Sequence, residues 1–205
     1  MKYFLDTEFI EGFHRPLFGK KRHFIDLISI GIVCEDGREF SSISQEYNFR
    51  DADAWVKENV ITPLYTQRVH GDARNHLSVS NFHKTLGNTV ENISYQIKCF
   101  FDCWRDQHFW RAPEGIEVYG YFSDYDWVLF CSLFGRMIDL PKGFPMYCVD
   151  LKQTLDEKGL HLKKHPDYPK QTSEHNALAD ARWNYELYRF LNNENVEVKT
   201  KGGGK

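Results

Sequence analysis

The chain has 205 residues, of which 41% are hydrophobic and 27% are charged, and its formal net charge is −3 at pH 7. This length favours one α/β domain with a sizeable core over two full domains. The small negative charge argues against broad electrostatic wrapping of a polyanion. The sequence has five cysteines, an odd number, and it lacks an apolar signal segment and a membrane-spanning run. These features predict a cytoplasmic protein with reduced thiols.

The N-terminal part of the chain predicts an antiparallel meander. Strands are expected at residues 2–10, 26–35 and 38–49. The first two are separated by a predicted loop that contains the breakers Pro16 and Gly19. The last two are joined at Asp36 and Gly37, a pair that strongly indicates a hairpin turn.

Helices and strands alternate after the meander. Residues 51–65 predict a helix that ends near Pro63, and the polar residues 66–88 predict an irregular segment. Further helices are expected at 89–104, 123–137, 150–159 and 178–191, and further strands at 116–122 and 146–149. The order predicts an α/β fold, with a mixed sheet flanked by helices. Residues 1–192 should form one domain, and the polar tail 193–205 should be disordered.

Two carboxylates stand in the first expected strand. In FLDTEF, Asp6 and Glu8 are two residues apart, so both side chains lie on one face of the strand. An edge strand with one solvated face would explain a single pair of this kind. On a central, otherwise apolar strand, neighbouring carboxylates are costly unless cations neutralise them. The pair therefore also predicts a metal site.

Two aspartates follow the strand expected at 116–122. Asp124 and Asp126, in YGYFSDYDWVLF, stand at the start of a helix. Ser123 and Asp126 fit a variant of the capping box, and the helix dipole favours acids at this end. The functional alternative is a carboxylate at the C-terminal end of a strand, where α/β sheets bind their ligands.

The stretch EHNALADA, residues 174–181, contains a histidine and an aspartate. His175 and Asp180 are too far apart to share a helical face, so His175 should precede the helix, with Thr172 or Ser173 as its cap. A lone histidine at such a position is more often a surface residue than a catalyst. The combination with the other acids fits one chemistry, however. Four carboxylates can bind two hard divalent cations, and an imidazole can accept a proton from water near neutral pH.

These residues resemble the motifs of the DEDDh 3′-to-5′ exonucleases, a superfamily with a ribonuclease H-like fold that includes ribonuclease T. The matching stretches are D-T-E in the first strand, Y-D-W-x-x-F at a helix start, and H-x-A-L-x-D-A near the C-terminus. The third is the most specific, because the DEDDy group carries tyrosine where this chain has Asn176. LISIGIV, ENVITPLY and PMYCVDLKQ further resemble a group of small bacterial and phage proteins described as 3′-to-5′ exoribonucleases.

The resemblance implies a role for each site residue. Two Mg²⁺ or Mn²⁺ ions would be held by four carboxylates, those of Asp6, Glu8, Asp126 and Asp180. His175 would be the general base, and the family pattern selects Asp126 as the ligand and leaves Asp124 as a cap. The implied enzyme is a homodimeric, metal-dependent 3′-to-5′ exoribonuclease. It would act on single-stranded RNA or RNA 3′ overhangs and release nucleoside 5′-monophosphates.

Aromatic and basic residues follow the first motif closely. Basic groups can hold phosphates and rings can stack on bases, so this segment predicts a rim for single-stranded nucleic acid. The candidates are Phe9, Phe13, His14, Arg15, Lys20, Lys21 and Arg22. Phe9 would wedge between terminal bases, as similar positions do in related nucleases, or it would equally be a core residue. The alternative is a solvated loop whose aromatic rings turn inward.

Two other functions remain open. A 3′-to-5′ exonuclease acting on single-stranded DNA would use the same motifs, because recognition of a 2′-hydroxyl depends on a few contacts that the sequence does not reveal. The other alternative is a non-catalytic nucleic-acid-binding module that keeps the fold. A binding module has no need for clustered, mutually repelling carboxylates, and this counts against it.

Overall fold

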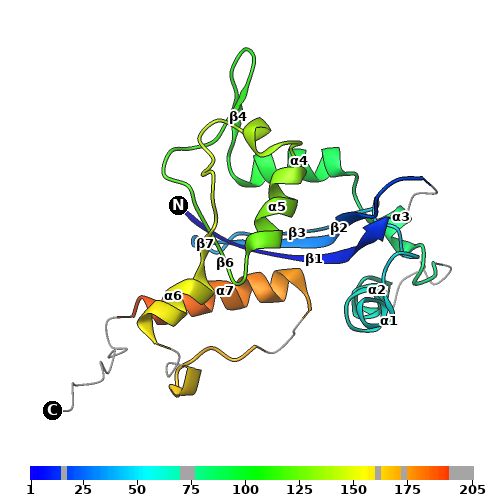
Figure 1. Cartoon of the computed structure of the whole chain (residues 1–205). Helices are drawn as coiled ribbons and strands as arrows, with labels where there is room; N and C mark the ends of the chain where they lie inside the picture. The colour runs from blue at the N-terminus through cyan, green and yellow to red at the C-terminus, as the bar shows by residue number, and fades with distance from the viewer. Residues whose placement is uncertain (15–17, 70–76, 160–162, 172–174, 194–205) are drawn as a thin grey trace.

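A five-stranded mixed sheet in the order β3-β2-β1-β6-β7 organises the chain (Figure 1). The computed structural model describes residues 1–14, 18–69, 77–159, 163–171 and 175–193. The antiparallel meander consists of β1 (Lys2–His14), β2 (Arg22–Cys34) and β3 (Glu39–Ile43). The parallel part consists of β6 (Glu117–Gly120), which pairs with β1, and β7 (Val149–Asp150), which pairs with β6. The predicted ribonuclease H-like α/β fold is therefore confirmed.

Helices cover both faces of the sheet (Figure 1). α4 and α5 lie on one face, α6 and α7 lie on the other, and α1 and α2 lie beside the far end of the β1–β2 hairpin. Their bounds are α1 Ala54–Val56, α2 Thr62–Val69, α3 Phe82–Leu86, α4 Val90–Phe100, α5 Asp124–Ser132, α6 Leu151–Lys158 and α7 Ala177–Leu191. Within the described ranges, no helix is long and apolar enough to cross a bilayer.

Alternate residues of β1 supply the cores on its two faces. Tyr3 and Leu5 belong to the buried cluster beneath α4 and α5. Phe4 packs with α6 and α7, and Ile10 packs with α2 and α3. The period of two along a strand therefore places Asp6 and Glu8 on the face that carries Phe4 and Ile10.

The β1–β2 hairpin is longer than the sequence predicted. Pairing continues to His14 and Arg22, so residues expected in the loop belong to strands. The register shifts between Glu8 and Phe9, which marks a β-bulge, and a bulge increases the local twist of a hairpin. We call the part beyond this bulge, residues 9–14 and 22–27, the arm. The predicted loop was wrong because alternating residues, several of them aromatic, continue the strand pairing as far as His14 and Arg22.

Other boundaries also differ from the prediction. The helix expected to end near Pro63 continues to Val69, through the π-helical turn η1 (Lys57–Ile61) and α2. Pro63 stands in the first turn of α2, where a missing N–H is tolerated. α3 forms inside the segment expected to be irregular. Two small elements were not predicted. They are the 3₁₀ turn η2 (Met137–Asp139) and the hairpin of β4 (Trp104–Arg105) and β5 (Trp110–Arg111).

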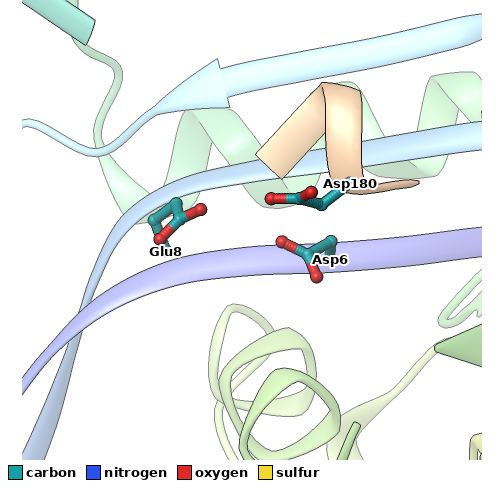
Figure 2. Close-up of side chains that lie close together, drawn as sticks. All are labelled: Asp6, Glu8 and Asp180. Atoms are coloured by element: carbon teal, nitrogen blue, oxygen red, sulfur yellow. The ribbon is translucent and has the colours of Figure 1, made fainter. Parts of the chain in front are cut away.

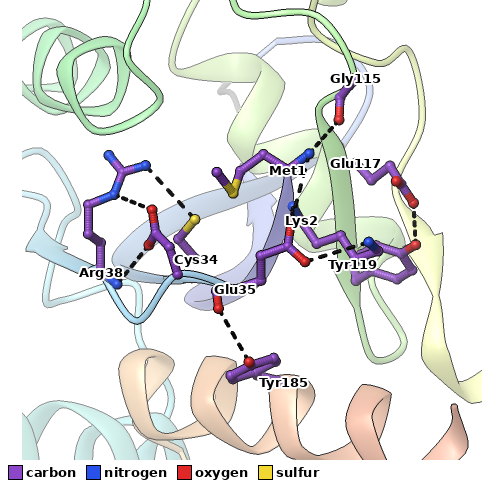
Figure 3. A network of polar contacts seen from close by, with 10 residues as sticks. Met1, Lys2, Cys34, Glu35, Arg38, Gly115, Glu117, Tyr119 and Tyr185 are labelled. Carbon is purple, nitrogen blue, oxygen red and sulfur yellow. Dashed lines mark hydrogen bonds and ion pairs between the residues drawn. The ribbon is translucent and has the colours of Figure 1, made fainter.

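A polar network fixes the start of β1 between β6 and the β2–β3 turn (Figure 3). The amino group of Met1 donates to the carbonyl of Gly115 over 2.8 Å. The backbone N–H of Lys2 donates to Glu35 over 2.8 Å, and its ammonium lies 3.5 Å from the same carboxylate. Tyr185 of α7 donates to the carbonyl of Glu35 over 3.4 Å. The network therefore connects β1 and α7, which carry Asp6, Glu8 and Asp180, through the β2–β3 turn.

Candidate active site

Three carboxylates from two elements converge at the centre of the sheet (Figure 2). One oxygen each from Asp6 and Glu8 of β1 and from Asp180 of α7 all lie within 4.8 Å of one another. Asp180 is buried, whereas Asp6 and Glu8 are partly exposed. The predicted shared face of Asp6 and Glu8 is the face that α7 covers.

A glycine opposite Asp6 allows α7 to approach the sheet this closely. Gly31 of β2 pairs with Asp6, and a Cβ atom on Gly31 would lie 2.3 Å from the carbonyl oxygen of Ala177. Ala177 and Ala181, two small residues of the stretch EHNALADA, are both buried. Backbone contact between the first turn of α7 and β2 thus sets the position of Asp180.

The edge of β1 becomes free where β6 ends, and two side chains bind the backbone there. β6 pairs with Lys2–Phe4 only. Beyond that range, the buried Asn184 of α7 donates to the carbonyl of Leu5 over 2.9 Å. The backbone N–H of Thr7 donates to Asp126 over 2.9 Å, and the Thr7 hydroxyl also bonds to this carboxylate. Asp126 therefore reaches the strand from α5, on the opposite side from α7.

Asp126 lies next to the three-carboxylate cluster but is not a member of it. Its carboxylate is buried and engaged by Thr7, whereas Asp124 is exposed at the first residue of α5. Ser123 is the N-cap residue by position but makes no side-chain capping bond, so the expected capping box with Asp126 does not form. Asp150 caps α6, since its carboxylate accepts from the N–H groups of Lys152 and Gln153.

His175 precedes α7 in an unusual backbone conformation. Its φ is 65°, a left-handed value that is uncommon for residues other than glycine and often marks a functional site. Its ring makes an edge contact with Trp55 of α1, with 4.7 Å between centroids. The N-cap of α7 is Asn176, whose side chain accepts from Ala179, and not Thr172 or Ser173, both of which fall outside the described residues.

Asp180 is held by neighbours that the sequence did not single out. The side-chain amide of Gln171 donates to one of its oxygens, and the backbone N–H of Asn176 donates to the other over 3.2 Å. These donors fix the carboxylate in the first turn of α7. Gln171, Asn184, Thr7 and Gly31 all act through tertiary contacts, for which no local pattern exists in the sequence.

The site is electrostatically strained without a cation. Burial raises the pKa of Asp6, and the charges of Asp126, Glu8 and Asp180 raise it further. Burial, with the charges of Asp180 and Asp126, raises the pKa of Glu8 to about 8. Burial also raises the pKa of Asp126 to about 6, although hydrogen bonds from Thr7 oppose the shift.

The donor set fits hard divalent cations. Among the described residues, none forms a salt bridge with any of the four motif acids. Carboxylate oxygens are the ligands that Mg²⁺ and Mn²⁺ prefer, and a cation would relieve the repulsion between them. In the part of the chain that the structure describes, no cluster of cysteine and histidine that would suit zinc lies at the site.

The candidate nucleic-acid residues lie on or beside the arm. Phe9, Phe13 and His14 are on β1, Arg22 begins β2, and Lys20 and Lys21 precede it. All except Phe9 are exposed, so the basic groups face solvent. Arg15 lies outside the described residues. The arm begins where the acidic cluster ends, because Phe9 directly follows Glu8 in β1, although successive side chains of a strand point to opposite faces.

The fold and the acidic cluster together define a nuclease of the ribonuclease H-like class. Residues 1–191 match the family described as "3′-5′ exoribonuclease Rv2179c-like domain". The chain is also 29% identical over 191 residues to two curated proteins, and the match covers 93% of each chain. These are the 3′-5′ exoribonuclease Rv2179c of Mycobacterium tuberculosis strain H37Rv and the 3′-5′ exoribonuclease MT2234.1 of strain CDC 1551. The chain belongs to the Rv2179c-like family of 3′-5′ exoribonucleases, which are phosphodiester hydrolases.

Proposed function

We propose that this enzyme removes nucleotides from the 3′ end of single-stranded RNA or of RNA 3′ overhangs in a divalent-cation-dependent reaction. The observation that carries the proposal is the convergence of Asp6, Glu8 and Asp180 within 4.8 Å, with Asp126 on the other side of the same strand. Carboxylates placed this closely repel one another, so they favour the binding of protons or of cations, and a divalent cation neutralises several of them at once.

Each motif residue has a distinct role in the proposed mechanism. Asp6, Glu8 and Asp180 hold the cations from one side, and Asp126 holds them from the side of α5. Two Mg²⁺ or Mn²⁺ ions would supply Lewis-acid stabilisation of the charge that develops on the scissile phosphate. Thr7 and Gln171 orient two of the ligands through their hydrogen bonds.

His175 acts as the general base in the proposal. It takes a proton from the water that attacks the terminal phosphorus in line with the departing 3′ oxygen. Its contact with Trp55 limits the positions that the ring can adopt. The products are a nucleoside 5′-monophosphate and an RNA shortened by one nucleotide. The homodimer and the cytoplasmic location stay predictions.

The proposal is tested with a 5′-labelled RNA that has a duplex region and a single-stranded 3′ overhang, beside the matching DNA. We expect a ladder that shortens from the 3′ end in Mg²⁺ and disappears in chelator, with RNA degraded faster than DNA. Faster degradation of DNA would replace the RNA assignment. If the nucleic acid stays bound in chelator and is never shortened, the chain is a binding module and the proposal fails.

Matched variants test the individual roles. Asp126→Asn and His175→Ala should leave the melting temperature close to that of wild type and reduce turnover by orders of magnitude. Asp124→Asn is the control, because Asp124 is exposed on the same helix two residues away. Wild-type turnover in Asp126→Asn, with loss in Asp124→Asn, would exchange the two assignments.

A further inference from the structure

A row of aromatic side chains lies along one face of the arm, on the side of β1 from which Asp126 of α5 reaches the strand. Phe9 makes an edge contact with Tyr125 of α5, with 5.5 Å between ring centroids. The ring of His23 lies 6.3 Å from that of Tyr125 and 5.4 Å from that of Phe13. The ammonium of Lys21 lies 3.7 Å from the centre of the Phe13 ring. The row therefore extends from Tyr125, which neighbours Asp126 in α5, toward the tip of the hairpin.

Phe9 is partly buried against the core beneath α4 and α5, whereas the other three rings of the row are exposed. Phe13 is 53% exposed and Tyr125 is 41% exposed, and His23 is also exposed. β6 pairs with Lys2–Phe4 only, so no strand adjoins β1 in this part of the described sheet. Rings that face water on a two-stranded arm do little for the stability of the fold, and this leaves recognition as their use.

Hydrogen bonds to Glu11 hold two rings of the row in place, those of His23 and Tyr125. Glu11, between Phe9 and Phe13 on the same face of β1, lies 2.7 Å from Nε2 of His23. The hydroxyl of Tyr125 donates to the same Glu11 oxygen over 3.3 Å. The acid in the row is thus engaged by both neighbours, and the contact fixes α5 relative to the arm.

The length and the charge of the row suit an extended single strand. Phe9 to Phe13 spans about 13 Å at about 3.3 Å per residue. This is the length of about four stacked nucleotides at about 3.4 Å each. The exposed Lys20, Lys21 and Arg22 stand at the far end of the row, where phosphates of the same strand would pass.

We propose that this row is a binding track for the nucleotides that precede the 3′ terminal one, so that the enzyme selects RNA long enough to reach it. The inference rests on the proposed function, since the terminal phosphodiester must lie at the acidic cluster. Sequence tolerance is expected, because every base offers a face to an aromatic ring. A dinucleotide is too short to reach the row, so the row should contribute nothing to its binding.

The test compares kcat/KM for a dinucleotide with kcat/KM for a ten-nucleotide single-stranded RNA of the same 3′ sequence. Wild type should prefer the longer substrate, and Phe13→Ala or His23→Ala should lower the ratio of the two values by about tenfold. Phe109→Ala is the matched control. Phe109 is 67% exposed in the β4–β5 hairpin, outside the row, and its removal should leave the ratio at the wild-type value.

Each outcome has one meaning. If wild type shortens neither RNA, the proposed function itself fails. If wild type shortens both and the arm variants keep the wild-type ratio, the track is refuted while the enzyme assignment stands. Equal losses on both lengths, or a fall of the ratio in Phe109→Ala, would also refute it, because the effect would then be general. Melting temperatures check that the variants are folded.

Discussion

The position of Asp180 depends on a glycine in another strand, and this can be tested by one methyl group. In Gly31→Ala, the new Cβ would lie 2.3 Å from the carbonyl oxygen of Ala177 and 2.4 Å from the backbone nitrogen of Leu178. Ordinary contacts between carbon and oxygen are about 3.3 Å or longer. Because the neighbouring atoms are backbone, α7 must move away from β2 by about 1 Å.

The shift should affect both stability and catalysis. Overpacking of this kind costs about 2 kcal/mol in the free energy of unfolding. A displacement of about 1 Å in a catalytic group reduces turnover by about 100-fold. Urea denaturation measures the first effect, and the rate of nucleotide release from single-stranded RNA in Mg²⁺ measures the second.

A core variant separates the two effects. Ile97→Val, in the buried cluster beneath α4, should cost about 1 kcal/mol and leave the rate of the folded enzyme unchanged. If Gly31→Ala is as stable and as active as wild type, close contact between α7 and β2 does not set the site. If it loses stability but keeps the wild-type rate, the position of Asp180 is not the critical variable.

Three further predictions concern Glu8, His83 and Trp55. Because the folded pKa of Glu8 is raised to about 8, the folded state binds more protons than the unfolded state above pH 4.5. In the presence of chelator, the free energy of unfolding should therefore fall toward pH 8 more steeply in wild type than in Glu8→Gln. Mg²⁺ should restore the stability of wild type. Equal slopes of the free energy against pH in the two proteins would contradict this. Burial lowers the pKa of His83, whose ring stacks on Tyr47, to about 4. Between pH 6.5 and pH 4, the free energy of unfolding of wild type, measured by urea titration, should therefore fall by about 3 kcal/mol relative to that of His83→Phe. Trp55→Ala should lower kcat about tenfold with little change in KM, because the ring of Trp55 contacts that of His175. Trp55→Phe should recover most of the loss. If it does not, the ring contact does not position His175 for catalysis.

Local patterns in the sequence were sufficient for the parts of the site that lie within one element. The period of two in β1 predicted the shared face of Asp6 and Glu8, and the helix that follows His175 predicted Asp180 in a first turn. The mixed sheet followed from the order of strands and helices, because hydrophobic periodicity identifies elements even when their ends are uncertain.

The parts that escaped prediction depend on contacts between distant segments. In the sequence, nothing distinguishes Gly31 from other strand glycines, and its importance comes from its backbone contact with α7. Asn184 reaches the carbonyl of Leu5 because α7 packs on β1, and Gln171 bonds to Asp180 from the segment that precedes α7. The length of the arm was missed because breakers at a hairpin tip resemble those of a long loop, and strand pairing decides between the two.

The central claim, that the carboxylates of β1 and α7 form a divalent-cation site, is tested most directly by calorimetric titration of Mn²⁺ into metal-free protein. We predict two ions per chain for wild type, and for Asp180→Asn an affinity at least about tenfold lower. Binding of equal strength in wild type and Asp180→Asn, or no binding in wild type, would contradict the account.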